Sequence, residues 1–487
     1  MRIVKVLLAL GAFTSVLHAQ QPQREDPNAK YVKVPKGTTV LRHVRVIDGT
    51  GAAPLEDQDV LIADGKIVSV GKVVAPEHAT VLDLTGDTVF PGLVGMHDHM
   101  YYLTRPDLDV TGASEPPVIV PELGFSSPRL YLGAGVTTLR TTGSVEPYFD
   151  LNLRTMIDEG HLIGPHIDVT GPYLEGLHAF ALEMHQLKDA DDARATVDFW
   201  AAQGVTSFKA YMNITRVELK VAIEEAHKHG LKLTGHLCSV TYPEAVELGI
   251  DNLEHGFFVN TQLDPGKQPD VCPPTNGNRT LAKMTPDSPE GKALIALLVS
   301  HHVAITSTLP VFQSYDPAHL HLQPRVLAAM SAPTREAYLT TRNLELMRAA
   351  ANPAAAAERA KLFKNGMAME RAFVAAGGLL LAGPDPTGDG GTLPGFGDQR
   401  EVELLVEAGF TSVEAIKIAT LNGAIYEGRD KTIGSIQAGK NADLVVVKGN
   451  PAADINDIEN TEIVFKDGVG YDSKKLLDSV KGRYGQY

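Results

Sequence analysis

The chain has 487 residues and a formal net charge of −15, with 44% hydrophobic and 21% charged residues. This length exceeds the roughly 250–300 residues at which a single core stops growing, so it predicts a large domain with a smaller one beside it. The apolar share is that of a soluble globular protein. The acidic balance argues against a nucleic-acid partner and against anionic membrane surfaces, which attract clusters of Lys and Arg.

The first 20 residues have the pattern of a signal peptide. Arg2 and Lys5 precede an apolar run over residues 6–17, and Ala19 offers a small residue for cleavage. The run is too short to span a bilayer, and no cysteine follows it that could carry a lipid. We therefore expect an exported protein, periplasmic or secreted, without a membrane anchor. Residues 21–36 are polar and interrupted by prolines, which predicts a linker.

Short β-rich segments occur near both ends of the mature chain. Apolar and polar residues alternate between Gly and Asp turns in residues 37–90, as in QDVLIADGKIVSVG, and again in residues 431–487, as in NADLVVVKG. Such patterns predict hairpin-forming strands. Because the termini of a domain often lie close together, we expect one small β-sandwich built from both chain ends.

Residues 91–430 alternate short apolar strands with helical patterns. The clearest helix signal is TRVELKVAIEEAHKHG, where Thr215 and Glu218 form a capping box and Gly230 is a C-cap. Strand–helix alternation repeated eight times predicts an α/β fold with a (β/α)₈ TIM-type barrel. Long connections over 256–298 and 313–370 are expected at its catalytic face. The expected strands are 93–96, 136–139, 167–170, 207–210, 231–234, 252–253, 303–306 and 379–382.

The chain has two cysteines, Cys238 and Cys272. They could pair in an oxidising compartment. Two cysteines in so long a chain are more often unpaired, so we favour free thiols, although the sequence does not decide between the two states.

Side chains with metal-binding chemistry stand at the ends of the expected barrel strands. His97 and His99 are two residues apart on a strand, so both face the barrel lumen, and imidazole suits Zn²⁺ and similar divalent metals. Each candidate alone has an ordinary structural explanation. Residues at the C-terminal ends of different barrel strands converge on one site, so their joint occurrence predicts a metal centre. The other members are Lys209, His236, His255 and Asp385, which end the fourth, fifth, sixth and eighth strands.

With these residues the chain resembles the amidohydrolase superfamily. The resemblance covers nearly the whole mature chain. It is greatest to the imidazolonepropionase-like and Xaa-Pro dipeptidase-like branch, through VFPGLVGMHDHM, GAGVTTLR, AHKHGLKLTGH, NLEHG, IKIATLNGA and IGSIQAGKNADLVVVKGNP.

The resemblance implies a centre of two divalent ions, with Zn²⁺ the expected metal. Two such ions share a hydroxide that attacks the scissile carbonyl, and Asp385 would pass its proton to the leaving amine. The alternative for Asp385 is a purely structural ligand. The implied ligands are His97, His99 and Asp385 for one ion, His236 and His255 for the other, and Lys209 as a bridging carbamate formed with CO₂.

Three further residues are candidates for substrate binding. Tyr211 shares the strand face of Lys209 and could donate to the developing oxyanion, or it could simply pack in the wall. His178 resembles a substrate-contacting histidine of the branch. Arg140 could hold a substrate carboxylate, although a buried structural ion pair is the stronger alternative.

We therefore expect a metal-dependent amidohydrolase that cleaves the amide bond of a small molecule, a dipeptide or an N-acyl amino acid. A homo-oligomer is compatible with the sequence. Hydrolysis of a cyclic amide of lactam or imidazolone type stays open. A deaminase is less favoured because Ser239 stands where such enzymes carry a glutamate. A non-catalytic scaffold is less favoured because all six ligands are kept.

Overall fold

The computed structural model describes residues 26–104, 118–179, 181–388 and 391–486. The expected signal peptide over 1–20 and the first part of the expected linker lie outside these ranges. Within these ranges, no helix combines the length and apolar character needed to cross a membrane.

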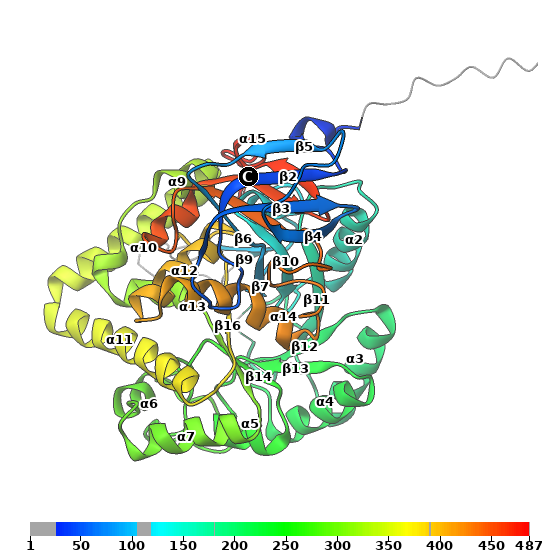
Figure 1. The fold of residues 1–487 in the computed structure, drawn as a ribbon. Helices are drawn as coiled ribbons and strands as arrows, with labels where there is room; N and C mark the ends of the chain where they lie inside the picture. The colour runs from blue at the N-terminus through cyan, green and yellow to red at the C-terminus, as the bar shows by residue number, and fades with distance from the viewer. Residues whose placement is uncertain (1–25, 105–117, 180, 389–390, 487) are drawn as a thin grey trace, which may run out of the picture.

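Eight parallel strands form a barrel at the centre of the molecule (Figure 1). Each strand pairs with its neighbours in chain order. The backbone N–H of Asp385 donates to the carbonyl of His97 at 3.0 Å, which links the end of the last strand to the first. The (β/α)₈ prediction is confirmed. The strands are β7 (Leu93–Asp98), β10 (Val136–Thr141), β11 (His166–Leu174), β12 (Ser207–Ala210), β13 (Lys232–Gly235), β14 (Asn252–Glu254), β15 (Ala304–Ser307) and β16 (Leu380–Ala382).

Helices alternate with these strands and cover them. Because both faces of the barrel sheet are covered, strands such as β7 and β12 are buried at every residue rather than alternating. The predicted capping box of Thr215 and Glu218 is present at the start of α4. The helices up to the sixth strand are α1 (Ser127–Gly133), α2 (Pro147–Asp158), α3 (Ala190–Gln203), α4 (Arg216–Lys228) and α5 (Tyr242–Leu248).

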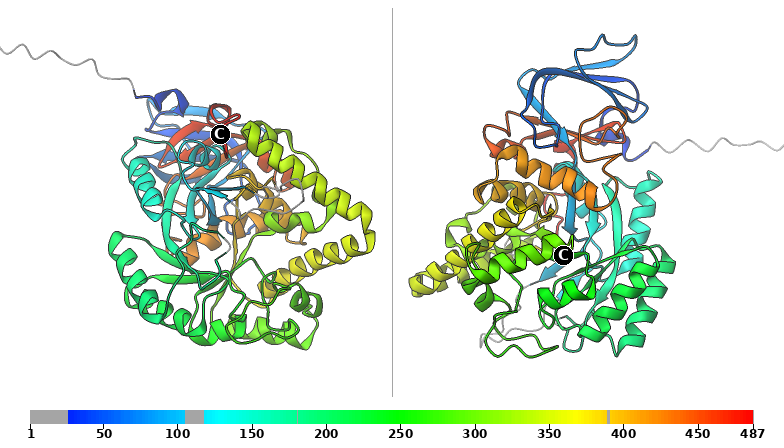
Figure 2. Two further views of the ribbon diagram at one scale, coloured as in Figure 1. Left: turned by 180° about the vertical axis from the view of Figure 1, so that it is seen from behind. Right: turned by 60° about the horizontal axis from the view of Figure 1, so that its bottom comes forward.

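The two long connections follow β14 and β15. Phe258 from the first and Phe312 from the second stack at 4.4 Å, and the ring of Phe312 lies 5.7 Å from that of His255. Both connections therefore reach the end of the barrel that carries the histidines. Figure 2 shows α10 and α11 extending outward on the side away from α3 and α4. Their helices are α6 (Asn278–Lys283), α7 (Pro289–Ser300), α8 (Leu309–Phe312), α9 (Pro324–Ala329), α10 (Ala332–Ala351) and α11 (Pro353–Ala375).

A nine-stranded sheet built from both chain ends lies beside the barrel, above it in Figure 1. Antiparallel pairing of β6 with β17 joins the two contributions, with Val89 opposite Val446. The sheet has its own apolar core. Its strands are β1 (Val32–Val34), β2 (Thr39–Val46), β3 (Leu55–Ala63), β4 (Lys66–Gly71), β5 (Thr80–Asp83), β6 (Asp87–Pro91), β17 (Leu444–Lys448), β18 (Thr461–Lys466) and β19 (Val469–Asp472).

Strand β1 lies within the segment that was expected to be a linker. It pairs with β19, and Val34 is 1% exposed in the core of the sheet. This part of the segment is therefore a strand. A three-residue strand is too short to show alternation, and its partner is more than 400 residues away in the sequence. The remaining elements are β8 (Tyr102–Thr104), β9 (Val118–Val120), α12 (Phe396–Glu407), α13 (Ser412–Lys417), α14 (Gly423–Tyr426) and α15 (Ser473–Ser479).

The packing of α11 against β15 buries a carboxyl group and makes stability depend on pH. Glu370 is fully buried and accepts a hydrogen bond from the Ser307 hydroxyl at 2.8 Å. Burial raises the pKa of Glu370 from 4.5 to about 8. Between these two values the unfolded chain loses this proton while the folded protein keeps it, so the free energy of unfolding falls as pH rises from about 4.5 to about 8.

We expect Glu370→Gln to make this fall shallower, because the amide has no proton to lose in that range. Urea denaturation midpoints of the wild type and the variant, measured from pH 5 to pH 9, check this expectation. Equal slopes for the two proteins would contradict it.

Candidate metal centre

Four imidazoles, one amine and one carboxylate meet at the C-terminal ends of the barrel strands. Nε2 of His97 lies 3.1 Å from Nζ of Lys209 and 3.7 Å from Oδ1 of Asp385. Nε2 of His99 lies 3.1 Å from the same carboxylate oxygen. One donor atom each from His97, His99 and Asp385 lie within 4.8 Å of one another. The first, fourth and eighth strands thus aim their polar side chains at one point.

The other two histidines complete the cluster from the fifth and sixth strands. The ring centres of His236 and His255 are 4.2 Å apart, and those of His97 and His255 are 4.6 Å apart. Nδ1 of His255 lies 2.9 Å from the hydroxyl oxygen of Thr308. The structure therefore brings together all six residues that were expected to bind metal.

Burial controls the charge state of the imidazoles. It lowers the pKa of His97 and of His255 well below the ordinary value, and neighbouring Lys209 and His236 lower these pKa values further. Burial also lowers the pKa of His99, although the Asp385 carboxylate opposes it. The rings of His97, His99 and His255 are therefore neutral near pH 7, which is the form that binds metal.

The pKa values of Lys209 and Asp385 are also shifted in ways that fit a metal site. Burial alone would raise the pKa of Asp385, but His97, His99 and Lys209 together hold it well below its usual range. Burial lowers the pKa of Lys209 to about 8, against the opposing pull of Glu254 and Asp385. A fraction of the lysine amine is therefore uncharged at neutral pH.

Two of the six residues have unusual backbone conformations. His255 has a φ of 68° and Asp385 a φ of 55°, which lie in the left-handed region that most side chains avoid. Such strain is found at functional sites when the surrounding structure enforces it. At His255 and Asp385 the chain turns away from the strand direction, and the side chain of each residue lies in the cluster.

The donor set fits divalent metal ions. Nε2 of His255 is buried and has no hydrogen-bond partner among the described residues, so no described side chain competes with a ligand at this atom. Imidazole nitrogens with a carboxylate oxygen suit Zn²⁺ and similar ions.

The substrate-binding candidates lie in different surroundings. The Tyr211 ring packs edge-on against His236 at 4.8 Å and against Tyr173 at 4.9 Å, so it lies beside the cluster. His178 is exposed, and its main chain is held by Gln186 and Asn213. The contribution of Tyr211 and His178 to substrate binding stays a prediction.

Arg140 is buried and forms an ion pair with Glu254. It is 1% exposed, and its Nη2 donates to Oε1 of Glu254 at 2.8 Å and to the Met96 carbonyl at 2.6 Å. Its Nη1 is also buried and has no hydrogen-bond partner among the described residues. The structure thus supports the buried ion pair, the stronger of the two alternatives for Arg140, and substrate binding by this residue stays a prediction.

Sequence reasoning missed Glu254, which lies directly under the cluster. Its Oε2 lies 2.8 Å from Nδ1 of His97. The available signal was a charged residue on a short buried strand, two positions after Asn252 and therefore on the same face. An acid buried at that place needs a cationic partner, and Arg140 is that partner.

A disulfide joins Cys238, two residues after His236, to Cys272 in the first long connection. The expectation of free thiols is therefore wrong. The loop after β13 and the connection after β14 leave neighbouring strands at the same end of the barrel, so 34 residues of sequence separation close to a Cα distance of 4.8 Å. The hydroxyl of Thr261 also donates to the Cys238 carbonyl at 2.8 Å.

We expect the double change Cys238→Ala and Cys272→Ser to lower the free energy of unfolding by about 2–4 kcal/mol, because the bridge restricts the unfolded chain. Urea denaturation with and without a reducing agent measures the effect. Reduction should destabilise the wild type and leave the variant unchanged. A wild type that is insensitive to full reduction would contradict the expectation.

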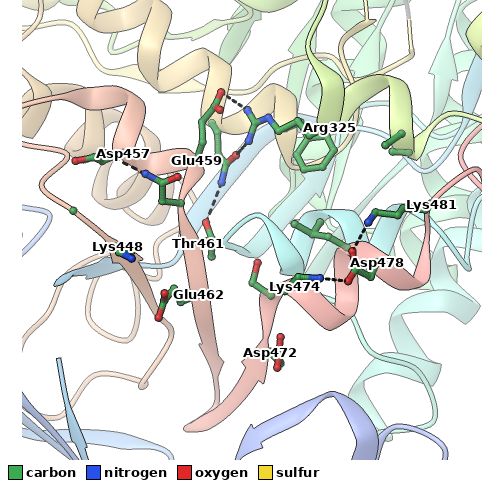
Figure 3. Close-up of a pocket in the computed structure, with 18 of the residues that line it drawn as sticks. Arg325, Lys448, Asp457, Glu459, Thr461, Glu462, Asp472, Lys474, Asp478 and Lys481 are labelled. Carbon is green, nitrogen blue, oxygen red and sulfur yellow. Dashed lines mark hydrogen bonds and ion pairs between the residues drawn. The ribbon is translucent and has the colours of Figure 1, made fainter. Parts of the chain in front are cut away.

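A cavity of about 920 Å³ lies elsewhere, where the nine-stranded sheet, α9, α12 and α15 meet (Figure 3). Its charged groups largely satisfy one another: Arg325 pairs with Glu459, and Asp478 pairs with Lys474 and Lys481. None of the predicted site residues is among the described residues that line it. The cavity is therefore separate from the candidate metal centre.

Comparison with known proteins supports the assignment of the fold. Similar solved structures include a Xaa-Pro dipeptidase with bound methionine in its active site, at a TM-score of 0.65 and 19% identity over 90% of this chain and 100% of that one. A bottromycin amidohydrolase has a TM-score of 0.65 and 21% identity, with coverage of 91% and 90%. The ochratoxinase of A. niger has a TM-score of 0.63 and 16% identity, with coverage of 92% and 99%. At these identities the similarity shows the fold.

At the sequence level, a dihydroorotase from Pelotomaculum thermopropionicum (strain DSM 13744 / JCM 10971 / SI) is 43% identical over 65 residues, which are 13% of this chain and 14% of that enzyme. The chain thus matches a short part of this relative. The model of the amidohydrolase family matches residues 88–469, well over half of the sequence. The chain therefore belongs to the amidohydrolase family and is a hydrolase of carbon–nitrogen bonds.

Proposed function

We propose that the protein is an exported hydrolase with two divalent metal ions that cleaves the amide bond of a dipeptide or N-acyl amino acid. The observation that carries the proposal is the convergence of the six side chains, with Nζ of Lys209 at 3.1 Å from Nε2 of His97. His97, His99 and Asp385 would hold one ion, and His236 and His255 the other. Zn²⁺ is the proposed metal because imidazole dominates the ligand set.

Lys209 would bridge the two ions as a carbamate. The ammonium group first loses one proton. The uncharged amine then attacks CO₂, a C–N bond forms and a second proton leaves, so a cationic side chain becomes an anionic oxygen donor. Its place inside the cluster supports this role, because an unmodified ammonium group beside two divalent cations would be strongly disfavoured. Bound to these residues, the two ions would supply a nucleophilic hydroxide and polarise the scissile carbonyl.

Asp385 is proposed as the proton carrier of the reaction. Its ionised carboxylate can accept the proton of the nucleophile and donate it to the leaving amine, which otherwise departs as a poor leaving group. Its position 3.7 Å from Nε2 of His97 and 3.1 Å from Nε2 of His99 supports this role.

The proposed substrate class rests on the walls of the site. The rings of Tyr101 and Tyr173 lie 4.5 Å and 6.5 Å from that of His99, and Tyr211 packs against His236. Three aromatic rings on one side favour a substrate with an apolar group next to the scissile bond. The fold shared with a Xaa-Pro dipeptidase also supports a substrate of amino-acid type.

A substrate screen tests the proposal. Zn²⁺-loaded protein should release free amino acids from apolar dipeptides or N-acyl amino acids, detected by derivatisation of the new amine, and chelation should stop the release. Turnover confined to cyclic amides would replace the substrate class with ring hydrolysis. Absence of any metal-dependent amide hydrolysis would reject the function.

Export is part of the proposal. The amino-terminal pattern supports it, and so does the bond between Cys238 and Cys272, because disulfides persist in oxidising compartments. The full chain expressed in bacteria should be recovered outside the cytoplasm, with an amino terminus near residue 20 by mass spectrometry. Retention of an uncut chain with free thiols in the cytoplasm would contradict export.

A further inference from the structure

We propose that Glu254 is a positioning residue that directs Nε2 of His97 toward its metal, and that Arg140 determines which atom of residue 254 faces His97. This inference rests on the metal centre proposed above. Glu254 is fully buried, and its two oxygens have different partners. Oε2 lies 2.8 Å from Nδ1 of His97. Oε1 accepts hydrogen bonds from Nη2 of Arg140 at 2.8 Å and from the hydroxyl of Thr234.

The contact with Oε2 decides which ring nitrogen of His97 carries hydrogen. A carboxylate paired with arginine offers no hydrogen, so Nδ1 must be the donor. In the neutral ring the lone pair then lies on Nε2. This atom faces Lys209 at 3.1 Å and Asp385 at 3.7 Å, where the metal would lie. A carboxylate behind a metal-binding histidine fixes both the tautomer and the ring orientation.

Arg140 makes this arrangement asymmetric. Its Nη2 also faces the Met96 carbonyl at 2.6 Å and Oδ1 of Asn252 at 3.1 Å, and its Nε donates to the same Met96 carbonyl. The guanidinium only donates and is held in place by these acceptors. The atom of residue 254 that faces Arg140 must therefore be an acceptor.

This asymmetry gives Glu254→Gln a specific consequence. The glutamine oxygen has to face Arg140, so its amide nitrogen takes the place of Oε2 and points at Nδ1 of His97. The ring must then accept at Nδ1 and carry its hydrogen on Nε2, the atom that the metal needs. An isosteric change thus places the histidine in the wrong tautomer.

His255 provides a contrast within the same centre. Its Nδ1 faces the Thr308 hydroxyl, which can donate or accept by rotation. This contact supports the ring without imposing a tautomer. The effect of Glu254→Gln should therefore fall on one of the two metal positions.

The experiment is a Co²⁺ titration of metal-free protein, followed by visible absorbance and by metal analysis. Wild type should bind two equivalents. Glu254→Gln should bind one of them about 10–100-fold more weakly, the usual cost of losing such a partner. In the double variant Glu254→Gln with Arg140→Met, no guanidinium requires an acceptor from residue 254. The amide can therefore turn its oxygen toward Nδ1 of His97, and most of the lost affinity should return.

Glu370→Gln is the matched control, since it makes the same change at a fully buried carboxyl whose hydrogen bond goes to Ser307. It should leave both affinities unchanged. Circular dichroism checks folding. If Glu254→Gln alone does not fold, the double variant carries the test, because it buries no uncompensated charge.

The outcomes separate the two proposals. If Glu254→Gln bound both equivalents of Co²⁺ with the affinity of the wild type, the positioning role would be overturned. A folded double variant that binds one Co²⁺ about 10–100-fold more weakly than the wild type would overturn the tautomer argument. Failure of the wild type to bind two equivalents would instead count against the proposed function.

Discussion

Replacing Lys209 with alanine is expected to remove one of the two metal ions and to lower kcat/KM by more than about 100-fold, the upper range for loss of an outer partner. The reason is that the proposed bridge supplies a ligand to both ions, and Nζ of Lys209 lies 3.1 Å from Nε2 of His97 inside the cluster. Metal analysis of the purified variant, together with the dipeptide assay, measures both effects.

Lys232→Ala is the matched control for this change. Lys232 begins the neighbouring strand β13, but its amine donates to the Tyr426 carbonyl, away from the cluster. This variant should keep two ions. Propionate should partly restore Lys209→Ala, because a small carboxylate can occupy the space of the carbamate. Two tightly bound ions in Lys209→Ala would contradict the bridging role.

Asp385→Asn is expected to lower kcat by about 10²–10⁴-fold on amide substrates, because a carboxamide cannot carry the proton to the leaving amine. The change preserves shape, so the backbone bond from Asp385 to His97 at 3.0 Å should persist. The loss should be much smaller on an ester with a nitrophenolate leaving group, which departs without a proton. Parallel assays on matched amide and ester substrates measure the difference.

Metal analysis is the companion measurement for Asp385→Asn. If the ion is retained and the loss depends on the leaving group, the proton-carrier role stands. If kcat fell equally on the amide and the ester and one ion were missing, Asp385 would be assigned to metal binding alone.

The sequence by itself determined the architecture and the members of the candidate centre. The eight expected strands begin within one residue of those observed, whereas β7, β10 and β11 end two to four residues later than expected. The starts agree because each strand is a short apolar run between turn signals that act locally. His97 and His99 were recognisable because alternate residues of a strand share a face. His236, His255 and Asp385 were recognisable because the ends of barrel strands converge.

Only the tertiary structure decided which side chains pair across the barrel. Arg140 and Glu254 are 114 residues apart, and no local pattern says that one neutralises the other. The bond between Cys238 and Cys272 depends on two loops leaving the barrel at the same end, and strand β1 depends on a partner at the far end of the chain. Periodicity and turn signals are set by neighbouring residues, whereas the partner of a buried charge or thiol is set by how distant segments pack.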